Sequence, residues 1–202
     1  MRPCNWLLSG LLCLTACSCG IGRKGTILPA DVSLREGDVV FRRGGGFTSH
    51  AVIIADNGGI YSHVGIVVDS AGVLMVVHAV PGEPDFDGDE DRVKMDRPAD
   101  FFDCMRADRG AVYRPTDSIA ARQAARQALA SYRRRTLFDH DYDDSDTTAM
   151  YCTELVVHAY SKSCCPLQGL GRHHLHLVGF EADCVLPSDI LHCRNLKKIT
   201  TF

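Results

Sequence analysis

The sequence predicts one α+β domain in which an antiparallel sheet packs against helices. Two β-branched runs, residues 62–69 (SHVGIVVD) and 73–82 (VLMVVHAVPG), are joined by Ser-Ala-Gly, which is a hairpin signal. Residues 117–134 carry alanines and charges at helical spacing. No internal repeat or low-complexity linker divides the chain, so we expect these elements to share one core.

The first residues, 1–16, predict an export signal. Arg2 precedes an apolar run that lacks acidic residues and is too short to span a bilayer comfortably. The run ends in Leu14-Thr15-Ala16-Cys17, which looks like a lipobox that is cut before Cys17, the cysteine that is then acylated. We therefore expect a bacterial cell-envelope protein, lipid-anchored to the membrane, with a tether over 17–35 and a domain over 36–202. A plain secretory signal with a chance cysteine is the alternative.

Length and charge restrict the class of protein. The chain has 202 residues, enough for one domain with a substantial core and too few for two comfortable ones. Its formal net charge is −3 and its basic residues form no long block, so we expect no nucleic-acid partner. The run RRGGG lacks the Lys-Ser/Thr of a phosphate loop, so nothing supports nucleotide binding.

The remaining elements follow in chain order. Residues 36–43 (EGDVVFRR) read as a strand, and residues 47–57 as a short helix capped by Thr48 or Ser49. After the hairpin, residues 92–96 (RVKMD) are a candidate third strand. The helix over 117–134 has Asp117 or Ser118 as its cap, and another short helix begins at Cys152. A tail that carries cysteines and histidines closes the chain.

The cysteines suggest a free thiol. Of ten, two leave with the signal and Cys17 takes the lipid. The odd number that remains in an exported protein predicts up to three disulfides and one unpaired cysteine. These seven are Cys19, Cys104, Cys152, Cys164, Cys165, Cys184 and Cys193.

Cys152 is our candidate for the unpaired thiol because it lies where a helix begins. A helix N-terminus or a neighbouring histidine lowers a thiol pKa, so we expect a reactive thiolate there. The buried stripe behind it would be Leu155, Val156, Ala159 and Tyr160. His63 begins a hydrophobic strand, and His78 lies in the next one. Pairing residues 64–68 with residues 74–78 would bring the two imidazoles together as a base and its orienting group.

Several motifs occur in an order that points to a family. They are GDVVF, YSHVGIVV, HAVPG, YCTELV and LPSDIL, with Phe138-Asp139 ahead of the acidic run. This set resembles the permuted papain-like YaeF/YiiX amidases, a circularly permuted branch of the NlpC-type cysteine peptidases, over about residues 36–195. The resemblance implies a nucleophile at Cys152, a general base at His63 and an orienting group at His78. Several relatives carry Glu at this last position.

The implied function is hydrolysis of a peptide or amide bond through an acyl-enzyme, with backbone N–H groups near Cys152 stabilising the oxyanion. Cell-wall peptides are one substrate class. A lipid acyltransferase or thioesterase is the alternative within enzymes, because the lecithin:retinol acyltransferase branch is similar to the same core. No cofactor or metal is expected.

A zinc-binding envelope protein is the non-enzymatic alternative. It would use His173, His174 and His176 with the nearby Cys164 and Cys165, but adjacent cysteines match no structural zinc pattern. Residues 85–91 (DFDGDED) fail the calcium-loop pattern, because their glycine falls at the fourth position, and predict a solvated loop over the site.

Overall fold

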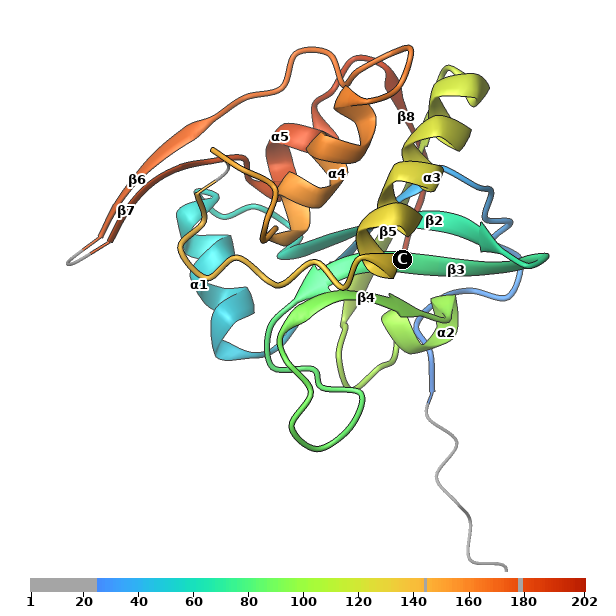
Figure 1. Ribbon diagram of the computed structural model, residues 1–202. Coiled ribbons are helices and arrows are strands. Elements are labelled where there is room, and N and C mark those ends of the chain that lie inside the picture. Colours follow the sequence, from blue (N-terminus) through green and yellow to red (C-terminus); the bar gives the residue numbers. More distant parts are fainter. Residues whose placement is uncertain (1–24, 144, 178–179) are drawn as a thin grey trace, which may run out of the picture.

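One six-stranded antiparallel sheet organises the protein (Figure 1). The computed structural model describes residues 25–143, 145–177 and 180–202. The strand order is β4-β3-β2-β1-β5-β8, and each neighbouring pair is antiparallel. The strands are β1 Val39–Arg43, β2 His63–Ser70, β3 Val73–Val80, β4 Arg92–Asp96, β5 Arg109–Pro115 and β8 Leu196–Thr201.

Helices and a separate two-stranded ribbon complete the fold. The ribbon, β6 with β7, extends past α1 (Figure 1). The predicted α+β architecture is therefore confirmed. These elements are α1 Phe47–Ala55, α2 Pro98–Phe101, α3 Ser118–Arg133, α4 Cys152–Ser161, α5 Pro187–Leu191, β6 His173–Leu177 and β7 Phe180–Cys184.

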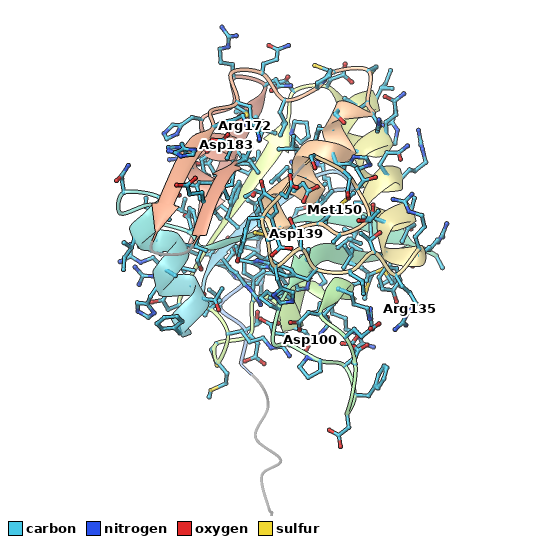
Figure 2. The ribbon with its side chains drawn as sticks, turned by 60° about the vertical axis from the view of Figure 1, so that its left-hand side comes forward. Asp100, Arg135, Asp139, Met150, Arg172 and Asp183 are labelled. Carbon is cyan, nitrogen blue, oxygen red and sulfur yellow. The ribbon has the colours of Figure 1, made fainter. Side chains whose placement is uncertain are left out.

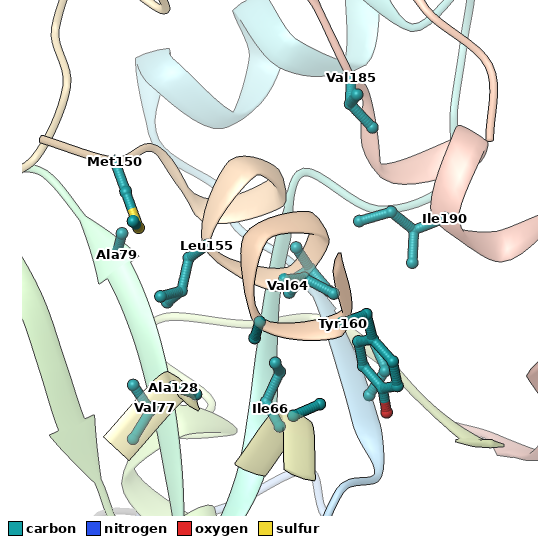
Figure 3. Packing of buried hydrophobic residues seen from close by; sticks show 14 of the residues in the cluster. Val64, Ile66, Val77, Ala79, Ala128, Met150, Leu155, Tyr160, Val185 and Ile190 are labelled. Atoms are coloured by element: carbon teal, nitrogen blue, oxygen red, sulfur yellow. The ribbon is translucent and has the colours of Figure 1, made fainter. Parts of the chain in front are cut away.

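The main core lies between the sheet and helices α3 and α4. Strand side chains alternate between faces, so Val64 and Ile66 of β2 point to this core while Val67 points to a smaller cluster around α2. Alanines of α3 pack onto the sheet, and the predicted stripe of α4 is fully buried. Figure 3 shows Leu155 and Tyr160 of α4 beside these strand residues. This packing fixes the direction of α4 and the place where it starts.

The β2–β3 hairpin has a different register from the one predicted. Ala71 and Gly72 in the turn both have positive φ, as the two-residue turns that suit hairpins require. Ile66 pairs with Val77, one residue away from the expected alignment. A shift by one residue moves a side chain to the other face. The observed register puts His63 and His78 on the same face, whereas the predicted one would have separated them.

Other expectations need correction. The N-cap of α1 is Gly46, without a side-chain cap bond from Thr48 or Ser49, and no residue of α1 is buried. Residues 26–34, predicted as tether, belong to the domain: the backbone N–H of Ile27 donates to the Phe102 carbonyl (2.9 Å), and Val32 packs on the α2 cluster. β5, the ribbon and β8 were not predicted.

The cysteine expectation also changes. The six described cysteines are free thiols, spread over separate elements and loops, so the predicted disulfides do not form among them. Cys152 is therefore not singled out by elimination. The signal, Cys17 and Cys19 lie outside the described residues. Within the described residues, no helix has the length and apolar character needed to cross a membrane.

The cap of α3 gives a test of the fold. The carboxylate of Asp117 accepts from the backbone N–H groups of Ile119 (2.7 Å) and Ala120 (2.9 Å). We predict that Asp117→Ala lowers the free energy of unfolding by about 1 kcal/mol, while Asp117→Asn, which can still cap, loses much less. Urea denaturation measures both. Equal losses for the two variants would contradict a capping role.

Candidate active site

A polar cleft of about 460 Å³ opens where α4 begins. Cys152 is the first residue of α4, and His63 is the first residue of β2; both line the cleft. The backbone N–H of Val64, which follows His63, donates to the Cys152 sulfur. The structure thus brings the predicted nucleophile and base to one cavity. Other lining residues include Arg42, Gly44, Gly45, Gly46, Ser62, Glu83, Arg106, Phe138, Tyr142 and Tyr151.

A line of hydrogen bonds runs away from the cleft behind His63. Its Nε2 lies 2.9 Å from Nδ1 of His78, and Nε2 of His78 lies 3.2 Å from Oδ2 of Asp96. Asp96 also contacts Arg106 at 3.3 Å. Both imidazoles pack against the Phe101 ring of α2. His78 therefore occupies the predicted position, and Asp96 extends the line beyond it.

Burial determines the charges of the two central groups. Burial raises the pKa of the Cys152 thiol to about 11, although the N–H groups of Val64, Thr153 and Cys152 itself and the charge of Arg42 oppose this. Burial, with Arg42 and His78, lowers the pKa of His63 well below its usual value. Both shifts favour the uncharged forms, a neutral thiol and a neutral imidazole. These shifts run against the thiolate that the sequence analysis expects at Cys152.

A second, apolar cavity of about 140 Å³ adjoins the cleft. Cys152, Tyr142 and Tyr151 line both, whereas His63 lines only the polar cleft. The cysteine thus lies at the junction of two chambers that differ in chemistry. The apolar cavity is lined in addition by Thr48, Ala51, Val52, Ala55, Thr153, Cys184, Val185, Leu186 and Pro187.

Charged residues of the cleft escaped the sequence analysis. Arg42 is buried, pairs with Glu83 and donates to the Phe101 carbonyl at 2.9 Å. Arg106 pairs with Glu83 at 3.0 Å. The loop over 85–91 is not simply solvated, since Asp85 and Asp89 bind Arg92 at 2.9 and 3.0 Å. The only sequence signal for Arg42 is an arginine that directly follows the apolar strand residues in the segment VVFRR.

The approach to Cys152 combines an aromatic and an acidic group. Phe138 lines the cleft, and buried Asp139 accepts from the backbone N–H of Asp141 at 2.8 Å. Asp139 and Met150 lie near the middle of the molecule in Figure 2, with Asp183 well apart on the ribbon. Burial, with Cys152 and Asp139 nearby, raises the pKa of Tyr142 to about 12.

The histidines proposed for zinc are occupied elsewhere. His173 lies 3.0 Å from Asp189, and His174 lies 2.9 Å from Asp183. The side chain of His176 is outside the described part. Among the residues described, no three His, Cys, Asp or Glu side chains are grouped as a metal ion would require. Among the described candidates, His173 and His174 each contact an aspartate and are not gathered with Cys164 and Cys165.

A cysteine at a helix start, with a histidine from a neighbouring strand and a polar group behind that histidine, is the arrangement of a papain-like site. The histidine precedes the cysteine in the chain, as in a permuted order. The family model described as the permuted papain-like amidase enzyme, YaeF/YiiX, C92 family matches residues 33–200, and the chain belongs to this family.

A solved structure has the same fold. It is described as the metalloprotein yiiX from Escherichia coli O157:H7, is 16% identical, and aligns with a TM-score of 0.65 over 83% of this chain and 97% of that one. A search of the curated proteins finds no match. The permuted papain-like fold is therefore established.

The burial of Cys152 predicts how its reactivity depends on pH. Its alkylation by iodoacetamide should keep rising up to about pH 11, because only the thiolate reacts and burial disfavours it. Peptide mapping by mass spectrometry follows the rate, with exposed Cys104 as the internal comparison. Full-rate modification of Cys152 already at pH 6 would show that a thiolate is held in the resting site.

Proposed function

We propose that the protein is a cell-envelope lipoprotein and a cysteine hydrolase that cleaves an amide bond through an acyl-enzyme. Cys152 is the nucleophile, His63 the general base and His78 the orienting residue. One observation carries this proposal: Cys152 and His63 line the same cleft. The Cys152 sulfur accepts a hydrogen bond from the backbone N–H of Val64, the residue after His63. The Nε2 atom of His63 is hydrogen-bonded to His78. The anchor at Cys17 rests on the sequence motif alone.

The reaction begins from the neutral pair. His63 takes the thiol proton as the sulfur attacks the carbonyl carbon, so charge forms only when the substrate is present. N–H groups at the start of α4 point at the oxyanion. His63 then gives the proton to the departing amine, and the C–N bond breaks. Water attacks the thioester, its proton passes to His63, and the thiol is restored as the acid leaves.

The chemistry of the two chambers supports a separate place for each half of the substrate. The leaving group must meet His63, so it lies in the polar cleft beside Glu83 and Arg106. The acyl group then extends into the apolar cavity, which His63 does not line. At about 140 Å³ this cavity is close to the roughly 150 Å³ of an apolar cavity that holds benzene. An apolar group of about six carbons fits it.

This cavity also favours the second candidate function, a lipid acyltransferase or thioesterase on the same core. Both functions share the acyl-enzyme and differ in the group released and the acceptor. Peptides with an apolar residue at the acyl side and short acyl lipids satisfy the cavity equally. Incubation with muropeptides and with acyl-lipids, followed by product analysis, separates them. The zinc-binding alternative gains no support from the site.

Replacement of the nucleophile is the direct test. Cys152→Ala should reduce turnover by roughly 10⁴-fold or more, since the triad acts as a unit, and leave the circular dichroism spectrum unchanged. Cys164→Ala, which removes an exposed thiol whose neighbours do not line the cleft, should retain full activity. Near wild-type turnover by Cys152→Ala would end the proposal.

The apolar cavity predicts acyl-chain selectivity. Ala55 lines this cavity and not the polar cleft, so Ala55→Leu should fill it. We expect kcat/KM for a hexanoyl p-nitrophenyl ester to fall about tenfold while the acetyl ester is little affected. Ile54→Leu, on the exposed side of the same helix, is the matched control. An equal fall of kcat/KM for the hexanoyl and the acetyl ester would show that the acyl group does not occupy the apolar cavity.

A further inference from the structure

Asp96 closes the hydrogen-bond line that starts at the cleft. It ends β4, next to the strand that carries His78, and its carboxylate lies 3.2 Å from Nε2 of that histidine. The His78 side chain is fully buried, and that of Asp96 is 12% exposed. Lys94 and Arg106 lie close enough to act on Asp96 electrostatically, and Arg42 and Glu83 act on His78. The proposed mechanism uses Cys152, His63 and His78 and gives Asp96 no role.

The carboxylate determines which nitrogens carry protons. An ionised carboxylate only accepts, so Nε2 of His78 must donate to Asp96. A neutral imidazole has one N–H, so Nδ1 of His78 is an acceptor and Nε2 of His63 donates to it (2.9 Å). The lone pair of His63 is then on Nδ1. Each proton position follows from the previous one.

Asp96 stays ionised over the working range of pH. Burial alone would raise its pKa, but the hydrogen bond from His78, with the charges of Lys94 and Arg106, lowers the pKa to about 2; burial lowers the pKa of His78, which favours its neutral form. Because the carboxylate never becomes a donor above that pH, the tautomer of His78 is fixed. This is what a general base requires, since His63 must present an unprotonated nitrogen to the thiol.

We propose that Asp96 is a positioning residue that sets the tautomers of His78 and His63, so that His63 presents a free Nδ1 to Cys152. The proposal rests on the proposed function of Cys152 and His63. Asp96 does not touch the substrate or the sulfur. A merely structural role, such as holding Arg106, would affect folding or binding without moving a proton between imidazole nitrogens.

The test compares three side chains at one position. In Asp96→Leu no acceptor faces His78, and Arg106 is released to donate to its Nε2, which drives the proton to Nδ1. With a proton on Nδ1 of His78, Nε2 of His63 must become the acceptor. The proton of His63 then moves to its Nδ1, the nitrogen that should be free to accept the thiol proton. We expect kcat to fall on the order of 10²–10⁴-fold with little change in KM. Asp96→Asn keeps one amide oxygen, which the N–H of Arg106 can hold toward His78, so it should lose much less activity than Asp96→Leu. Asp100→Leu, a nearby carboxylate without a bond to His78, is the control.

Nitrogen-15 NMR of labelled histidines gives a readout independent of turnover. We expect His78 and His63 to be protonated on Nε2 in the wild type, and His78 on Nδ1 in Asp96→Leu. A wild-type kcat in Asp96→Leu, or a loss of kcat without a change of tautomer, would overturn the proposal. Absence of Cys152-dependent turnover in the wild type would instead overturn the proposed function, and the NMR experiment would still report on Asp96.

Discussion

The site depends on one hydrogen bond, the contact between the imidazoles of His63 and His78. It exists because the β2–β3 hairpin pairs Ile66 with Val77 and not one residue away, which puts both histidines on one face of the sheet. The same alternation sends Val64 and Ile66 to the opposite face, where they join the main core. The force that buries these aliphatic side chains therefore also aligns the base with its support.

Burial of Cys152 and His63 favours their uncharged forms, although charged residues line the same cleft. In the proposed reaction, the negative charge moves onto a substrate oxygen that N–H groups can stabilise. The proposal therefore couples attack by the sulfur to occupancy of the cleft. The backbone N–H of Val64, which bonds the sulfur, holds the thiol in place until then.

Sequence reasoning predicted the hairpin, the strand at residues 92–96, the long capped helix and the helix that begins at Cys152, because these segments have strong local patterns. It missed β5 and β8, whose short runs carry charges and polar residues; β8 forms an edge of the sheet and β5 lies between it and β1. It placed His63 and His78 in one hairpin but gave the register that separates them, since pairing depends on the turn. Asp96 was invisible as a functional residue, because a single aspartate at a strand end usually faces solvent. Only its neighbours in space distinguish it.

Helix α1 lines the apolar cavity without having any fully buried residue. It contributes Ala51, Val52 and Ala55 to the apolar chamber, yet it buries none of its residues, and Phe47 and Ile54 are 91% and 77% exposed. Of this wall, Ala55 packs against the main core, whereas the opposite wall includes Val185 and Leu186, which are buried within that core. If the proposed acyl site is correct, the exposed helix α1 gives it a wall in which no residue is fully buried, so its shape can change with less disturbance of the core than a change at Val185 or Leu186 would cause.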